Sequence, residues 1–470
     1  MKNSNAYIAA LTLAVALSMP AAAQQQPQGT PLADPKPTTA VAPAPAPAPA
    51  PAADTAAKRP RYAAAPIEIQ YMRPLDKRGI GVFESPKVEG ADYTGFKLNW
   101  GAAFTQQYQN LSHSNTANAK IVNGVDANKL ITIGAGFNNA DANLAMNAQL
   151  ARGIRVTLNS NLSSRHHNET WVNDGYLLID ESPIDVPILN NIMKYLTLQV
   201  GQFELNYGDA HFRRTANGNA IFNPLVGNYI MDAYTTEIGA EALVRADGWL
   251  AMVGTTGGEI HGQVTAPASR SMAFLGKVGY DKQLTSDFRL RMTGSIYNTS
   301  NAASNTLYSG DRGGSRYYDV LENTASTETA QAWSGAIQPG FKNKIQAIVF
   351  NPFIKYQGLE LFGNIERAKG RAMTETADRT WNQNVAEAVY RFASDQLYLA
   401  ARYNTARGQL AGITGDVGAN RYQMGGGWFL TPNILTKVEY VSQKYNDFPS
   451  TDIRNGGKFS GLMIEGVVAF

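Results

Sequence analysis

The sequence lacks cysteine altogether, although the chain is 470 residues long. A disulfide scaffold is therefore excluded, and so is a lipid anchor built on an N-terminal cysteine. An excess of charge of one sign is lacking too, because 41 lysines and arginines stand against 38 aspartates and glutamates. The formal net charge of +3 leaves no dominant basic field, which argues against nucleic acid as a partner.

Long hydrophobic runs are also absent. One largely apolar stretch, residues 6–17, follows Lys2 and precedes the small residues 21–23. This order is typical of a secretory signal peptide, and the stretch is too short for a permanent membrane helix. We predict that residues 1–23 are a signal peptide. No later stretch approaches the roughly 18 consecutive apolar residues of a membrane helix, so membrane insertion would require β-strands.

Alternating proline marks the next region. The stretch VAPAPAPAPAPAAD, residues 41–54, is expected to form an extended, polyproline-like chain because proline interrupts helix and sheet hydrogen bonding. We predict that residues 24–65 are a disordered Pro/Ala-rich arm in the periplasm, acting either as a spacer or as a strut that engages the cell wall. Residues 66–90 follow as a periplasmic lead-in or a plug segment, and the sequence leaves both alternatives open.

From about residue 91 onward, apolar and polar residues alternate in one segment after another. Examples are residues 98–105, 143–150, 154–162, 288–296 and 397–404. A period of two indicates β-strands whose two faces meet different surroundings. The polar faces carry arginine, glutamine, asparagine and glutamate, whereas the apolar faces often end in an aromatic residue, as in the girdles of transmembrane barrels. The continuous Val/Ile/Leu runs of strands buried on both faces are missing.

We therefore predict an all-β fold for residues 91–470, a closed antiparallel transmembrane β-barrel. Closure is required because backbone polar groups in lipid are satisfied only when the sheet has no edge. If each strand with its connection takes about 24 residues, the barrel has about 16 strands, within the even-numbered bacterial series. Counts of about 14 or 18 strands would differ by one hairpin.

Two stretches resemble a known family. The segment YLTLQVGQFELNYGDAHFRR, residues 195–214, preceded by WVNDGYLLID, residues 171–180, resembles the phosphate-selective porin family. In that family an aromatic-bearing strand leads into a valine-glycine-glutamine-phenylalanine strand and an aromatic-glycine turn. The strand GLMIEGVVAF ends on Phe470, which looks like the assembly signal of outer-membrane barrels. The alternating pattern of the whole barrel fits the resemblance, and the motifs are specific at these two places.

The resemblance implies a bacterial outer-membrane porin, commonly a homotrimer, with an inward-folded loop and basic residues along an anion path. Its implied partners are outer-membrane lipid, the barrel assembly machinery, and small hydrophilic solutes or ions, including anions such as phosphate. The predicted lumen residues depart from this picture because they mix both signs: Arg155, Glu237, Glu241, Arg289, Arg291, Glu387, Arg402, Lys437 and Glu439. A general porin with mild ionic preference is therefore the prediction.

The stretch between Tyr207 and Thr236 exceeds any turn in length. Its candidates for a pore constriction are Asp209, His211, Arg213 and Arg214. If the loop folds into the lumen, its two arginines would face wall residues such as Glu237 and Glu241 and favour anions. An exposed loop is the alternative.

Histidine is scarce, with five in the chain. A barrel protease or phospholipase would need a histidine near a serine or a carboxylate. The densest polar group, residues 165–169, is read as a loop after a strand rather than as a metal site. No G-x-S-x-G or H-E-x-x-H motif is present. The sequence predicts no enzyme, no cofactor and no metal. The alternatives to a pore are a structural barrel tethered to the cell wall and, less favoured, a barrel enzyme.

Overall fold

The fold is known from a computed structural model. It describes residues 69–72, 83, 84, 87, 92–163, 170–214, 220–260, 270–309, 317–327 and 335–470. The predicted signal peptide and Pro/Ala-rich arm lie outside these residues, as do the loop 165–169 and most of the segment 66–90. Within the described part of the chain, no helix is both long and apolar enough to cross a membrane.

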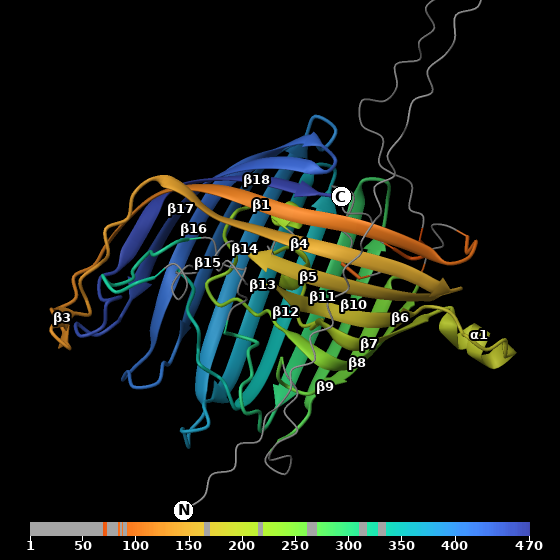
Figure 1. The fold of residues 1–470 in the computed structure, drawn as a ribbon, viewed down its shortest axis with the longest axis horizontal. Coiled ribbons are helices and arrows are strands. Elements are labelled where there is room, and N and C mark those ends of the chain that lie inside the picture. The colour runs from red at the N-terminus through yellow and green to blue at the C-terminus, as the bar shows by residue number, and fades with distance from the viewer. Residues whose placement is uncertain are drawn as a thin grey trace, which may run out of the picture. The chain divides into compact units, whose positions relative to one another are not determined.

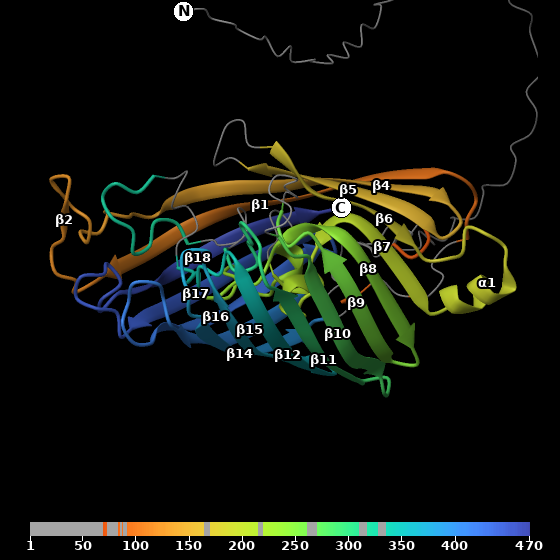
Figure 2. The same ribbon diagram turned by 90° about the horizontal axis from the view of Figure 1, so that it is seen from below.

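A closed antiparallel barrel of sixteen strands forms from the described residues, which confirms the predicted fold class and strand number (Figures 1 and 2). In chain order its strands are β1 (Lys97–Ser114), β4 (Gly136–Ala151), β5 (Ile154–Ser163), β6 (Thr170–Ile179), β7 (Leu196–Glu204), β8 (Thr236–Ala246), β9 (Trp249–Thr256), β10 (Ala273–Gln283), β11 (Phe288–Thr299), β12 (Lys344–Tyr356), β13 (Leu359–Arg371), β14 (Arg379–Phe392), β15 (Leu397–Gly408), β16 (Val417–Thr431), β17 (Ile434–Asn446) and β18 (Lys458–Ala469). Strands β2 (Ile121–Val122) and β3 (Val125–Asp126) form a separate small ribbon between β1 and β4.

The barrel closes where β1 pairs with β18. Ala103 lies opposite Ala469 in this register, and Phe470 exchanges two backbone hydrogen bonds of 2.9 Å with Ala102. The ladder then continues from β1 to β4 on the other side. The first and last strands of the barrel therefore satisfy each other, and neither of them presents an open edge.

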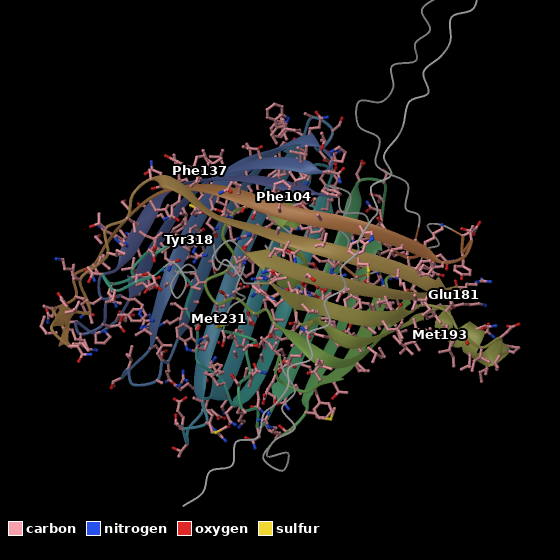
Figure 3. The ribbon with its side chains drawn as sticks, viewed as in Figure 1. Phe104, Phe137, Glu181, Met193, Met231 and Tyr318 are labelled. Carbon is pink, nitrogen blue, oxygen red and sulfur yellow. The ribbon has the colours of Figure 1, made fainter. Side chains whose placement is uncertain are left out.

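Alternation in the strands sorts side chains between the two sides of the wall. In β18, Leu462 and Ile464 are 47% and 43% exposed, while Met463 and Glu465, which alternate with them, are fully buried in the interior. Figure 3 shows Phe104 on the outer side of the barrel in the same way. Because the outer face is apolar and the inner face mixes polar and apolar side chains, the wall has the polarity of a transmembrane barrel.

The two ends of the barrel differ in the length of their connections. At one end the strands are joined by tight turns, such as Asp247-Gly248 between β8 and β9, where both residues have positive φ angles of 48° and 88°. This is the turn type that matches the twist of a hairpin. Longer connections join β1 to β4, β7 to β8, and β11 to β12 at the other end. The helix α1 (Pro187–Met193) lies at the short-turn end (Figure 1).

Closure predicts strong resistance to detergent. We expect the folded protein to stay compact in SDS without heating and to change its electrophoretic mobility after boiling, because a closed ladder has no edge from which to fray. Electrophoresis of heated and unheated samples measures this. Co-migration of the two samples, with circular dichroism showing folded protein before SDS is added, would contradict a closed barrel.

Candidate functional site

The connection between β7 and β8, residues 205–235, folds into the barrel. It contains the short helices η2 (Ala210–Phe212) and η3 (Ala220–Phe222). Val226, Ile230 and Met231 are completely buried and join one hydrophobic cluster with inward side chains of the wall. Figure 3 places Met231 within the outline of the barrel. Of the two alternatives left by the sequence, the structure therefore has the inward loop, which we call the lumen loop.

Side chains of the wall supply the partners that the irregular backbone of the lumen loop needs. Such partners are required because buried N–H and C=O groups are costly when unpaired. The wall oxygens of Asn351, Gln383, Asn404 and Glu439 accept from the backbone N–H groups of Asp209 (2.8 Å), Met231 (2.8 Å), Ile230 (2.6 Å) and Val226 (2.7 Å). These residues come from β12, β14, β15 and β17. These four strands bind the backbone of the loop, and loop side chains also reach β6, β7, β8, β10 and β11.

Two of the predicted lumen cations hold the loop instead of facing an open pore. The ammonium of Lys437 donates to three loop carbonyls at 3.0–3.2 Å and also pairs with Glu465. Arg402 donates to the carbonyl of Gly227 at 2.7 Å and pairs with Glu387. Both cations are therefore already paired with groups inside the protein.

The arginines of the lumen loop have partners other than those predicted. Arg213 lies 3.0 Å from Glu387 and 3.4 Å from Glu360. Arg214 pairs with Asp232 of the same loop, at 3.0 Å from Nε to Oδ1. The structure therefore pairs neither arginine with Glu237 or Glu241, because Arg213 reaches the wall at β13 and β14 and Arg214 stays within its own loop. Glu237 accepts from the Tyr297 hydroxyl at 2.9 Å, and Glu241 accepts from Asn206 at 3.4 Å.

Asp209 lies in a cluster of buried charges. Its carboxylate accepts from Arg291 at 2.7 and 2.8 Å, from Thr293 at 2.7 Å, and pairs with Lys277 at 2.6 Å. Arg291 also reaches Asp281 at 3.0 Å. Burial raises the pKa of Asp209, but the neighbouring Arg291 and Lys277 outweigh it and hold this pKa well below its ordinary value. Asp209 is therefore ionised throughout the physiological pH range.

A second carboxylate in this cluster, that of Glu84, comes from the segment before the barrel. Glu84 accepts from Arg291 at 2.8 and 3.0 Å and pairs with Lys277 at 3.1 Å. Although burial raises the pKa of Glu84, the charges of Lys277 and Arg291 bring it down to about 2. Phe83 beside it packs edge-on against Phe353 and Phe212, with ring centroids 5.6 and 5.7 Å apart.

Other described residues of this segment bind near the short turns. The Gln70 amide oxygen accepts from Gln149 at 2.7 Å, and the Tyr71 hydroxyl donates to Glu181 at 2.9 Å. Lys87 donates to the carbonyl of Asp180 at 2.5 Å. The described residues between 69 and 87 therefore contact the inner wall at several strands and reach the buried charge cluster.

Space remains in the barrel beside the lumen loop. A cavity of about 310 Å³ lies along the wall of β4–β8, bounded by the lumen loop and by the segment that carries Glu84. We call it the wall cavity. Its polar lining includes Glu84, Arg155, Asp174, Glu204, His211 and Glu241.

Two of the basic groups at the wall cavity contribute little free positive charge. Arg155 pairs with Asp180 at 3.3 Å. His211 donates through Nε2 to the amide oxygen of Asn206 at 3.3 Å, and burial together with the charge of Lys277 lowers its pKa to about 3. His211 is therefore neutral at physiological pH.

The residues predicted from the sequence take several different places in the structure. Those that hold the lumen loop are Arg213, Arg214, Glu387, Arg402, Lys437 and Glu439. Asp209, Arg289 and Arg291 belong to the charge cluster, where Arg289 meets Asp281 at 2.8 Å. Only Arg155, Glu241 and His211 among the predicted residues line the wall cavity. Glu237 lies in the interior hydrogen-bonded to Tyr297, and Phe470 is 62% exposed on the closing strand pair.

The residues missed from the sequence are Glu84, Asp174, Glu204 and Lys277. Lys277 alternates with apolar neighbours in β10, so the period of two that predicts Arg291 as a lumen residue also predicts Lys277 as one. Asp174 follows a β-bulge, because Asn159 and Ser160 pair with Asp174 and Val172 and leave Asn173 as the extra residue. The bulge breaks the period of two at this point. Glu84 has no such pattern around it, so no sequence signal pointed to it.

No protein-family model matches the chain, and no curated protein sequence matches it. Among solved structures, it is similar to an anion-selective porin from Comamonas acidovorans, with 11% identity, a TM-score of 0.45, and coverage of 80% of this chain and 100% of that one. The outer membrane channel DcaP of Acinetobacter baumannii gives 10% identity, a TM-score of 0.46, and coverage of 81% and 99%. The trimer form of OmpT of Vibrio cholerae gives 9% identity, a TM-score of 0.47, and coverage of 80% of this chain and 100% of that one. Membership of the phosphate-selective porin family is not confirmed.

Replacing Arg291 tests the charge cluster. Arg291→Met should lower the temperature at which the SDS-resistant form unfolds, because it leaves Asp209 and Glu84 with one cation fewer in a buried site. Breaking a buried ion pair from one side typically costs about 3–5 kcal/mol. The matched control is Arg407→Met, whose exposed pair with Asp447 contributes little. Equal unfolding temperatures for the two variants would show that the cluster does not stabilise the fold.

Proposed function

We propose that the protein is an outer-membrane porin, a water-filled channel for passive diffusion of small hydrophilic solutes or ions. The observation that carries this proposal is that the inward lumen loop does not fill the barrel. The loop is fastened to several strands of the wall, and the wall cavity of about 310 Å³ remains along β4–β8. An inward loop that narrows a barrel without filling it forms a constriction, where fixed charges act on passing solutes over short distances.

The charges favour a general porin over a phosphate-selective one. Arg213, Arg214, Arg402 and Lys437 each have acidic partners within the protein. A ladder of free cations would be needed to pass phosphate from site to site, and the cations named here are already neutralised. The path along the wall cavity instead has several carboxylates in its lining.

The segment that contains Glu84 is proposed to act as a plug that narrows the channel from the short-turn end. Its support is the set of contacts that Gln70, Tyr71, Phe83 and Glu84 make with the inner wall and the lumen loop. Glu84 is the charged anchor, because its carboxylate binds both Arg291 and Lys277. A simple lead-in outside the barrel would not need these buried contacts.

The two alternatives to a pore, a barrel enzyme and a structural barrel tethered to the cell wall, gain no support from the described residues. His113 and His211, the histidines in the described part of the chain, bond to the carbonyl of Ile131 and the amide of Asn206 rather than to a serine or carboxylate. This geometry does not activate a nucleophile. A cell-wall tether concerns the Pro/Ala-rich arm, which lies outside the described residues, and it is compatible with a pore.

Conductance in planar lipid bilayers tests both parts of the proposal. The full-length protein should produce discrete conductance steps, as expected for an open channel. Glu84→Gln should raise the mean conductance, because an amide loses the charge that holds the plug to Arg291 and Lys277. The control Glu375→Gln removes the same charge from an ion pair that joins the connection between β13 and β14 to Arg379 at the start of β14, and it should leave conductance unchanged.

The outcomes separate the two parts. If the wild type and Glu84→Gln are both correctly folded and neither gives conductance steps, the proposal of a porin is refuted. Steps of equal size in Glu84→Gln and Glu375→Gln would leave the porin standing and refute the plug.

A further inference from the structure

We propose that the outer face of the barrel binds a phosphorylated lipid. Its acyl chain lies in a groove on β12–β16, and its phosphate binds a group of cations at the long-connection end of β12 and β13. The inference concerns the lipid-facing side of the wall, so it goes beyond the proposed channel and does not depend on conductance. It adds a binding site and a ligand class.

An apolar groove of about 600 Å³ lies on the outer face of strands β12–β16. Small residues form its floor, because Gly363 of β13 lies opposite Ala386 of β14, and Ala388 of β14 lies opposite Ala401 of β15. The outward side chains of these strands are therefore short over two neighbouring rows of the sheet. The wall is hollowed there, where a bare sheet of larger residues would be filled.

Larger side chains border the groove on both sides. Leu361 of β13, 42% exposed, stands on one side. On the other side are Met424, 62% exposed, and the rings of Tyr403 and Tyr422, whose centroids are 4.7 Å apart. A chain that lies in this groove contacts apolar groups beneath it and on both flanks, which gives it more dispersion contacts than a flat lipid-facing wall does.

The polarity of the outer face changes from the groove toward the long connections. The next outward residues after Ala386 and Tyr403 are Asn384 and Thr405, which lie opposite each other. Beyond them is Arg367, four positions after Gly363 along β13, which is about 13 Å in an extended strand. The sequence of apolar groove, polar row and cation matches the order of acyl chain, linkage and phosphate in a lipid.

Four cations gather at the long-connection end of β12 and β13: Lys344, Arg367, Lys369 and Arg371. Asp378 binds Lys344 at 2.9 Å and Arg371 at 2.8 Å, and it lies 3.7 Å from Lys369. Arg367 is exposed and has no ion pair with a described carboxylate. Glu375, the other carboxylate of this connection, is paired with Arg379. The four cations therefore share one carboxylate, and the excess of positive charge attracts phosphate.

The groove and the cations together select the ligand. A neutral lipid would fill the groove and leave the excess positive charge without a partner. A soluble phosphate would bind the cations and gain nothing from the groove. A phosphorylated lipid uses both features, and the long-connection end that carries the cations is the end that faces outward in bacterial barrels.

Native mass spectrometry of the folded, full-length protein in detergent tests the site, because it measures the fraction of protein with lipid bound. The probes are dimyristoyl phosphatidic acid, dimyristoyl phosphatidylcholine and glycerol phosphate. The two lipids share their acyl chains, while phosphatidic acid and glycerol phosphate share their phosphate group. Phosphatidic acid should bind at least about tenfold more tightly than either of the others, because it alone reaches both the groove and the unpaired charge.

Two variants separate the parts of the site. Arg367→Gln with Lys369→Gln removes two of the cations and should weaken the binding of phosphatidic acid about tenfold, while the weaker binding of phosphatidylcholine stays the same. Ala386→Leu with Ala401→Leu fills the groove with apolar side chains that the lipid-facing wall tolerates. It should weaken the binding of both lipids.

Matched controls make the same changes elsewhere. Arg152→Gln with Lys282→Gln removes two exposed cations at the short-turn end, where they pair with Glu181 and Asp247. Ala240→Leu with Ala251→Leu adds the same bulk to exposed positions of β8 and β9. Both controls should bind phosphatidic acid like the wild type. SDS resistance confirms that each variant is folded.

The outcomes identify what occupies the outer face. Equal binding of the two lipids, or binding of phosphatidic acid that is unchanged in Arg367→Gln with Lys369→Gln, overturns the proposal. Glycerol phosphate that binds as tightly as phosphatidic acid makes free phosphate the ligand and also overturns it. If filling the groove leaves lipid binding intact but abolishes a dimer or trimer seen in the wild-type spectra, the groove is an interface between copies of the chain and the proposal is wrong. None of these results measures conductance, so the porin is tested separately.

Discussion

Lipid offers the polypeptide backbone no hydrogen-bond partner, and this constraint governs the architecture from its first strand to its last. Every strand must find a neighbour on both sides, so β1 has to meet β18, and Phe470 has to bond back to Ala102. Once the sheet is closed, its period of two divides the side chains between lipid and interior. The interior then receives a dense set of polar and charged groups that the fold has to satisfy.

The lumen loop meets the same requirement inside the barrel. Its irregular backbone cannot pair with itself as a strand does, so amide, carboxylate and ammonium groups of the wall supply the partners. Lys437 alone binds three of its carbonyls. Removing ions from water is expensive, and this accounts for the pairing of Arg213, Arg402 and Arg291 with carboxylates. Charges that hold the loop are not free to act on a passing solute.

The result is an asymmetric interior. On the side of β12–β17, cations and anions neutralise one another and fix the loop. Along β4–β8, the interior keeps the wall cavity, whose lining includes Asp174, Glu204 and Glu241. In the proposed channel, the lining of this cavity therefore matters more to a passing solute than the total of lumen charges.

The barrel, the two faces of its strands and its strand number follow from the sequence, because period-two alternation and chain length can be read without knowledge of contacts. The same alternation identified Arg291, Lys437 and Glu241 as inward residues. Which charges meet depends on the folded barrel. Arg213 pairs with Glu360 and Glu387. Because both glutamates lie far from Arg213 in the sequence, no local pattern predicts these pairs. Glu84 enters the charge cluster from a segment without alternation, and the bulge at Asn173 hides Asp174 from a period-two reading. Partner choice in the interior follows from where the loop is fastened, which is a property of the closed barrel as a whole.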